Sequence, residues 1–139
     1  MASKNRRIYL PSKARGSKPK IPDELKAEVQ RKFDHLIETE YRPKYIKPPS
    51  EKSSLGYLVD VFSQWYRSYF YICGTHHYPE LDADSSSLDV KYSRFEYAGG
   101  DRFNIAYLRH TGQWWQIRKN VPLDDCLEEA KNNQVLHPY

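Results

Sequence analysis

Residues 88–119 concentrate the side chains of this chain that are best suited to bind a ligand. Glycine-centred segments at 99–101 and 111–113 divide the stretch into three strands of alternating polar and apolar residues. The alternation predicts one polar sheet face, made of Tyr92, Arg94, Glu96, Arg102, Asn104, Leu108, His110, Trp114, Gln116 and Arg118. Arginines can contact phosphate, an indole can stack on a base, and amides can read base edges. The predicted nucleic-acid contacts on this face are therefore Arg94, Arg102, Asn104, Trp114, Gln116 and Arg118.

A basic arm is the second feature that points to nucleic acid. Residues 1–20 contain no acid and seven cations: Lys4, Arg6, Arg7, Lys13, Arg15, Lys18 and Lys20. The whole chain has a net charge of +4, so the arm's +7 leaves −3 for residues 21–139. Arms of this kind neutralise phosphates without reading sequence. We expect a flexible arm at 1–20, which binds RNA or another nucleic acid, or else an acidic protein surface.

His110 is the single candidate for catalysis. It can act as a general acid or base beside Arg109 or Arg102, as a metal-independent ribonuclease requires. The strand register, however, places His110 and Arg109 on opposite faces. No glycine-rich phosphate loop or nucleophile motif occurs. A non-enzymatic role is therefore favoured. A small enzyme, either a ribonuclease or one with a pocket between helix and sheet, stays open as an alternative.

Neither a metal nor a cofactor is expected. One polar loop is rich in histidine and acid but lacks the spacing of a metal site: His76, His77, Glu80, Asp82 and Asp84. The two cysteines, Cys73 and Cys126, form no C-x-x-C motif, and we expect them to be buried free thiols.

No apolar run approaches the roughly 18 residues of a membrane span. The basic N-terminus has no apolar region of the kind that secretory signals contain. We expect a cytoplasmic protein with no membrane partner.

The elements that must position these groups begin with a helix at 22–41. Pro22 suits the first helical position, and apolar residues recur at spacings of three and four from Leu25 to Ile37. The step from Arg42 to Pro43 is expected to end the helix, because the residue before proline avoids helical geometry.

Residues 55–73 are harder to assign. Their apolar residues fit a helical stripe, yet most are β-branched or aromatic, which favours one long strand that ends at Gly74. A bulge is expected near Ser63 and Gln64, and 75–87 is expected to be a polar loop.

The meander follows this strand. The first hairpin is expected to pair Tyr97 with Phe103 and Phe95 with Ile105, and the second to pair His110 with Trp114. A slip of one residue in any strand would exchange its two faces. A short helix at 122–133 and a loose tail at 134–139 complete the chain.

The predicted fold is a single α+β domain at 21–139, in which the N-terminal helix packs on a four-stranded antiparallel meander beside a short C-terminal helix. The predicted core comprises Leu25, Val29, Phe33, Leu36, Ile37, Phe95, Tyr97, Phe103, Ile105, Tyr107, Trp115 and Ile117.

The favoured function is a nucleic-acid-binding module or a small ribonucleoprotein subunit. An adaptor that binds another protein through the arm and the aromatic segment 65–71 is the first alternative. Its distinguishing feature is an exposed patch formed by Trp65, Tyr69 and Phe70.

Overall fold

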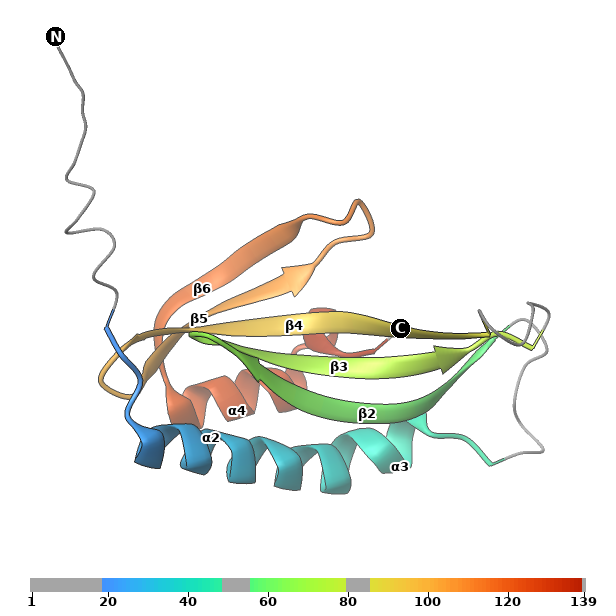
Figure 1. Cartoon of the computed structure of the whole chain (residues 1–139), viewed down its shortest axis with the longest axis horizontal. Helices are drawn as coiled ribbons and strands as arrows, with labels where there is room; N and C mark the ends of the chain where they lie inside the picture. The colour runs from blue at the N-terminus through green and yellow to red at the C-terminus, as the bar shows by residue number, and fades with distance from the viewer. Residues whose placement is uncertain (1–18, 49–55, 80–85, 139) are drawn as a thin grey trace, which may run out of the picture.

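Two helices cover one face of a five-stranded antiparallel sheet (Figure 1). The computed structural model describes residues 19–48, 56–79 and 86–138. The strands lie side by side in chain order: β2 (Tyr57–Tyr66), β3 (Tyr69–His77), β4 (Ser87–Gly99), β5 (Arg102–Leu108) and β6 (Trp114–Pro122). The helices are α2 (Asp23–Leu36) and α4 (Leu123–Asn132). The predicted α+β class, with a helix at each end of an antiparallel meander, is confirmed, whereas the predicted number of strands is wrong.

The first helix runs beyond its predicted end. After α2 the chain makes a π-helical turn (Ile37–Tyr41) and continues into α3 (Arg42–Tyr45). Within an ordinary α-helix the ring of Pro43 would clash with a carbonyl of the preceding turn. Here the N–H of Arg42 bonds to the Ile37 carbonyl, five residues back, and this wider turn accommodates the proline.

The segment predicted as one long strand forms two strands. β2 and β3 form a hairpin in which Tyr66 and Tyr69 are partners, and Arg67 has a positive φ of 55° in the turn between them. Strand rather than helix is correct here, but the predicted end at Gly74 is wrong, since β3 continues to His77. The predicted 75–87 loop therefore lies partly in β3 and partly, at Ser87, in β4.

The register of the first predicted hairpin is confirmed. Tyr97 lies opposite Phe103, and Phe95 lies opposite Ile105. Nearer the start of β4, the register of its pairing with β3 shifts, so that Ile72 faces Ser93 while Cys73 faces Lys91. This bulge turns Tyr92 into the core, where it is only 2% exposed, so its predicted place on the polar face is wrong.

The second predicted hairpin is longer than expected. Trp114 lies opposite Leu108, not His110, so residues 109–113 form the connection. The Arg109 N–H bonds to the Gln113 carbonyl at 2.9 Å and closes it. Two register shifts in the β5–β6 pairing, beside Ile105, then displace the second half of β6.

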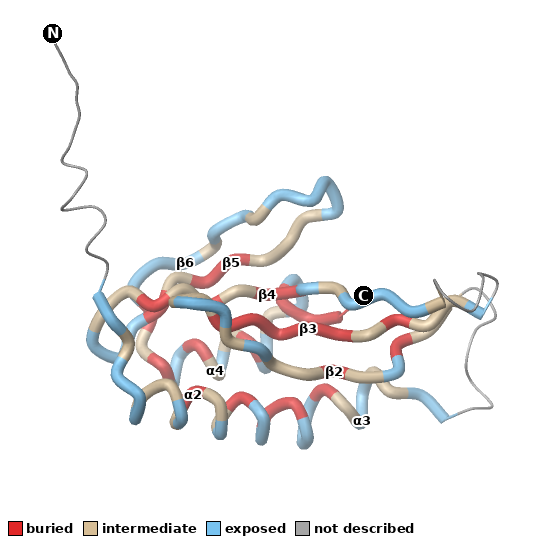
Figure 2. Tube along the Cα trace, viewed as in Figure 1, coloured by how far each residue is buried: buried red, intermediate tan, exposed pale blue. Residues whose placement is uncertain are grey.

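The core lies between the helices and the sheet (Figure 2). Phe33 of α2 packs against Phe70 and Phe95, with ring centroids 5.0 Å and 4.9 Å apart. The predicted core is confirmed as buried at Val29, Phe33, Leu36, Ile37, Phe95, Tyr97, Phe103 and Ile105. Leu25, Tyr107 and Ile117 are partly buried against it. Trp115 is 54% exposed, so its assignment to the core is wrong.

The C-terminal segment is packed rather than loose. Leu136, His137 and Pro138 are buried. The Nδ1 atom of His137 accepts a hydrogen bond from the Tyr45 hydroxyl at 2.6 Å, and its Nε2 donates to the Lys131 carbonyl at 3.1 Å. Two partners on different helices therefore fix this ring.

Because His76 and His137 are buried, we expect the free energy of unfolding to fall in mild acid. Burial lowers the pKa of His76, which bonds the Tyr92 hydroxyl, and burial with the nearby Lys44 lowers the pKa of His137. Below the ordinary histidine pKa of 6.5 the unfolded chain therefore binds more protons than the folded one. The free energy of unfolding should be unaffected by these groups above pH 6.5, and should decline as the pH falls toward their folded pKa. Urea titrations between about pH 7.5 and 5.5 measure this, and His137→Gln should reduce the slope.

Candidate nucleic-acid interface

The sheet face opposite the helices, here called the open face, carries the cations and aromatics. In β3, Phe70 and Ile72 belong to the core under α2, so the alternating Tyr69 and Tyr71 point to the other side. The open face comprises these two tyrosines with Gln64, Lys91, Arg94, Glu96, Asn104, Ala106, Leu108, Trp114 and Gln116.

One row of partners crosses all five strands of the open face. Gln64 faces Tyr71, Tyr71 faces Arg94, Arg94 faces Ala106, and Ala106 faces Gln116. Arg94 thus lies on the central strand with a tyrosine on one side and a small residue on the other. The space above Ala106 is filled, since Ala106 is only 2% exposed.

Trp114 reaches Tyr71 across the face because the sheet curls. Its ring centroid lies 5.7 Å from that of Tyr71, although β4 and β5 separate their strands. Three strand spacings in a flat sheet would place the two strands about 14 Å apart. The β5–β6 hairpin correspondingly rises away from the helix layer (Figure 1). The open face is therefore concave around Arg94.

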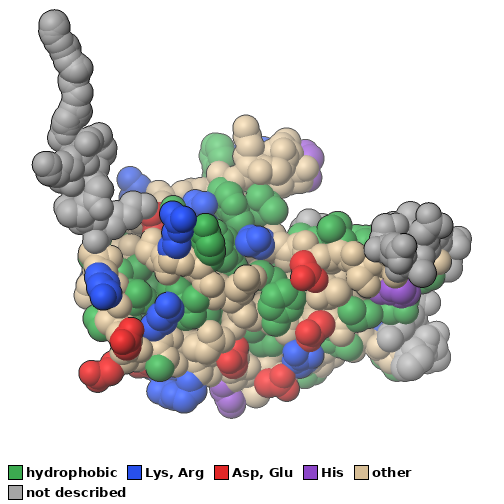
Figure 3. All heavy atoms as spheres, viewed as in Figure 1, with side chains coloured by type: hydrophobic (Ala, Val, Ile, Leu, Met, Phe, Trp, Pro, Cys, Tyr) green, Lys and Arg blue, Asp and Glu red, His purple; other side chains and the backbone are tan. Residues whose placement is uncertain are grey.

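Arg94 is held between two aromatic rings. Its guanidinium carbon lies 5.0 Å from the Tyr69 centroid and 4.8 Å from the Trp114 centroid. Its Nε is enclosed and has no hydrogen-bond partner among the described residues. The Lys91 Nζ lies 5.3 Å from the ring of Tyr71. In Figure 3, basic and hydrophobic side chains adjoin one another near the base of the β5–β6 hairpin.

Burial shifts the pKa values of titratable groups in the sheet and in the core beneath it. Burial raises the pKa of the Tyr71 phenol, and the charge of Arg94 opposes this rise. Burial raises the pKa of the Cys73 thiol to about 11 and that of Cys126 to about 12. Both cysteines are buried and free, so each stays a protonated thiol at neutral pH.

The predicted amide contacts differ in availability. Asn104 Nδ2 donates to the Glu96 carboxylate at 3.4 Å, and Asn104 Oδ1 accepts from the Asn120 N–H at 3.0 Å. Its amide is thus engaged within the protein. Gln116 is exposed at the end of the row that crosses the sheet.

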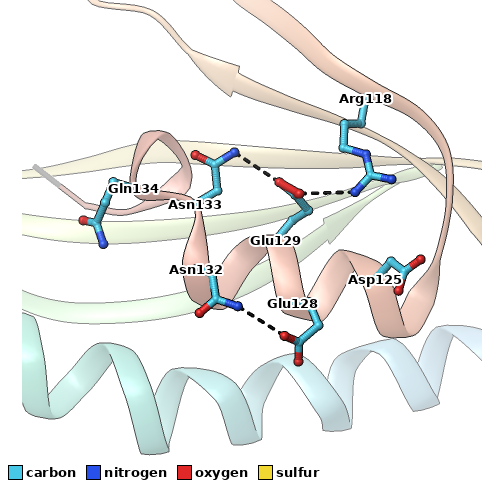
Figure 4. A pocket seen from close by; sticks show the side chains of 7 residues that line it. All are labelled: Arg118, Asp125, Glu128, Glu129, Asn132, Asn133 and Gln134. Atoms are coloured by element: carbon cyan, nitrogen blue, oxygen red, sulfur yellow. Dashed lines mark hydrogen bonds and ion pairs between the residues drawn. The ribbon is translucent and has the colours of Figure 1, made fainter.

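The two other predicted arginines differ in position. Arg118 lies beside the β6 bulge and forms an ion pair with Glu129 of α4 at 3.2 Å, on the helix side of the sheet (Figure 4). Its predicted convergence with Arg94 is wrong, because the bulge in β6 breaks the alternation. Arg102 precedes the buried Phe103 and so projects to the side of the sheet that carries Arg94, but it lies at the start of β5, away from the Arg94–Ala106 row, and donates to the Asn120 carbonyl at 2.9 Å.

His110 lies exposed in the β5–β6 connection. Arg102 is at the opposite end of β5, and the Arg109 guanidinium lies 5.0 Å from the ring centroid of Trp115. The predicted ribonuclease groups therefore do not converge on the open face.

Most of the predicted basic arm lies outside the described residues. Lys20 is described and is exposed. The remaining arm cations are Lys4, Arg6, Arg7, Lys13, Arg15 and Lys18. The loop acids Glu80, Asp82 and Asp84 also lie outside the described ranges. Within those ranges, no three His, Cys, Asp or Glu side chains are grouped so as to hold a metal ion.

Sequence reasoning did not identify Tyr69, Tyr71 or Lys91 as open-face residues. The signal was present in the alternation of Phe70 and Ile72 with the two tyrosines. It was obscured because no glycine marks the turn before Tyr69.

A family model, "Domain of unknown function (DUF3024)", matches residues 21–137. No curated protein and no solved structure matches the chain. None of the helices in the described ranges has the length and apolar character needed to cross a bilayer.

Proposed function

Since the chain belongs to the DUF3024 family, whose function is unknown, we propose a function from its own surface. The open face binds single-stranded nucleic acid, preferentially RNA, without catalysing a reaction. The observation that carries this proposal is the Arg94 guanidinium between the rings of Tyr69 and Trp114. Stacking on aromatic rings and guanidinium planes is the usual way in which proteins bind unpaired bases.

Preorganisation favours this role. The curled sheet already holds Trp114, Arg94 and Tyr71 together, so a ligand does not have to order them. The indole of Trp114 is half-buried, which fixes the ring while leaving part of it accessible. A base can therefore stack with a small loss of side-chain entropy.

The basic arm supplies most of the phosphate contacts in this proposal. Lys91 and Arg94 are cations of the open face, but Glu96 lies on the same strand and projects to the same side. Such a face has little excess positive charge. The seven cations of residues 1–20 then supply the salt-dependent part of the affinity, and the aromatic groups the rest.

The adaptor alternative has less support from the geometry. Phe70 is fully buried, and the ring of Trp65 packs against it with centroids 5.0 Å apart. Within the segment 65–71, Tyr66 is thus the main exposed aromatic residue, at 54% exposure.

Substitution of Trp114 tests the proposal. Trp114→Ala should weaken binding of a fluorescein-labelled RNA of about 20 nucleotides by roughly 5- to 150-fold, because one stacked base contributes about 1–3 kcal/mol. Arg94→Gln should also weaken binding.

Deletion of residues 1–20 should lower affinity and flatten its salt dependence, by up to about 0.7 in the log–log slope for each phosphate that the arm neutralises. Fluorescence anisotropy across a salt series measures all three.

Arg118→Gln is the matched control, since Arg118 is an exposed strand arginine on the opposite side of the sheet. It should change RNA affinity by no more than about twofold. The proposal is wrong if the intact chain does not bind RNA at low salt, or if Arg118→Gln weakens binding as much as Arg94→Gln does.

A further inference from the structure

A pocket of about 720 Å³ lies under the β5–β6 hairpin, separate from the open face. It is bounded by the end of β5 and the connection after it on one side, and by the C-terminal residues 134–138 on the other. Small-molecule sites in proteins commonly have volumes of about 300–1,000 Å³. The pocket is therefore large enough for an organic ligand.

The walls of this pocket are mostly apolar and partly fixed. Tyr107, Val135 and Pro138 line it together with His137. Both nitrogens of His137 already have partners, the Tyr45 hydroxyl and the Lys131 carbonyl. This ring consequently offers the pocket a flat, immobilised wall rather than a free acid or base.

The formally charged side chain of the pocket is a cation. Arg109 lines it, and no Asp or Glu is among the described lining residues. Stacking on Trp115 holds the Arg109 guanidinium, whose planar array of donors suits a carboxylate or phosphate. Trp115 is 54% exposed and Val135 is 47% exposed, so apolar surface lies beside this cation.

A neighbouring pocket provides a contrast in charge. It lies on α4 and is lined by Asp125, Glu128 and Glu129, with the single cation Arg118 paired to Glu129 (Figure 4). Gln134 lines both pockets. An anion is thus disfavoured at the α4 pocket and favoured under the hairpin.

We infer that the pocket under the β5–β6 hairpin binds a small organic anion that has a flat, apolar body. The anionic group pairs with Arg109, and the body packs against Val135 and the His137 ring. This site is independent of the proposed RNA interface, because Trp114 and Trp115 are consecutive strand residues and point to opposite sides of the sheet.

The probe for this inference is 2-naphthoate, and its neutral analogue 2-naphthamide is the control ligand. Titration of the intact chain, followed by ¹H–¹⁵N NMR, should give a Kd between about 10 μM and 1 mM for naphthoate. The shifted resonances should cluster at residues 107–110 and 134–137. Naphthamide should bind at least about 5-fold more weakly, since it lacks the charge that pairs with Arg109.

Two variants and one control complete the test. Arg109→Gln removes the charge and should weaken naphthoate binding by about 10-fold, while leaving naphthamide binding nearly unchanged. Val135→Asp places a carboxylate in the exposed rim and should abolish naphthoate binding. Lys119→Gln removes an exposed cation of the adjacent strand and should have no effect. Equal affinity for the two ligands, no naphthoate binding at about 5 mM, or shifts confined to other surfaces would each overturn the inference. None of these results bears on RNA binding to the open face.

Discussion

Replacement of Phe33 by alanine should lower the free energy of unfolding by about 3–5 kcal/mol, the usual cost of deleting a fully buried phenyl ring. Phe33 is 1% exposed and packs against Phe70 of β3 and Phe95 of β4. It therefore joins the helix layer to the centre of the sheet. The neighbouring backbone belongs to a helix and two paired strands, so the cavity has little means of collapsing. Against a total stability of roughly 5–15 kcal/mol, this loss leaves the protein close to unfolding.

Urea unfolding followed by far-UV circular dichroism measures the effect, with the m-value as a check that the transition stays two-state. Arg31→Ala is the matched control, because Arg31 is on the exposed side of the same helix. It should change stability by less than about 0.5 kcal/mol. A loss below about 1 kcal/mol in Phe33→Ala would mean that α2 does not pack on β3 and β4 through this ring.

Local signals in the sequence were sufficient for part of this fold. The apolar spacing of the first helix predicts the face on which Val29 and Phe33 are buried. The two glycines at 99 and 100 specify a tight turn, which fixes the register of β4 and β5 as predicted. In both places the residues that determine the geometry are neighbours in sequence.

Other features depend on interactions that sequence patterns do not reveal. The turn between β2 and β3 places Arg67, not a glycine, at positive φ. The Tyr97 N–H of the neighbouring β4–β5 hairpin donates to the Ser68 carbonyl of this turn at 2.9 Å. Because this stabilising partner is distant in sequence, the residue pattern of 57–77 gives no local sign of the turn and resembles that of one continuous strand. The bulges that redirect Tyr92 and Arg118 likewise have no sequence signature here.

The shared face of Trp114 and Arg94 was nevertheless predictable, because side chains along a strand alternate between the two faces of the sheet. The sequence predicts Trp114 opposite His110, whereas it lies opposite Leu108. A shift of two residues keeps every side chain on its face, while a shift of one exchanges the faces. Trp114 and Arg94 therefore meet on the open face despite the wrong pairing. Arg118 lies beyond a one-residue irregularity and is absent from that face.

Replacement of Gly74 by alanine should destabilise the protein by about 1–3 kcal/mol, because the added methyl group overpacks the core. An ideal Cβ at this position would lie 2.5 Å from the Tyr92 hydroxyl oxygen and 2.8 Å from Leu58 Cδ1. Tyr92 is 2% exposed and its hydroxyl is bonded to His76, so its ring cannot move aside cheaply. Thermal and urea unfolding should both show the loss.

The sign of the stability change in Gly74→Ala distinguishes steric overpacking from the usual backbone effects of replacing a glycine. Gly74 is not among the glycines with positive φ, so alanine meets no backbone strain there. By reducing the freedom of the unfolded chain, alanine should by itself stabilise the protein by about 0.4–1 kcal/mol. Any net destabilisation must therefore come from the collision with Tyr92 and Leu58. Gly112→Ala provides the converse comparison, since φ is +86° and no heavy atom of the described residues lies within 4 Å of its Cβ position. It should show backbone strain alone. A Gly74→Ala variant as stable as the parent would mean that the Tyr92 side chain lies outside the core, and would contradict the β4 bulge that turns it inward.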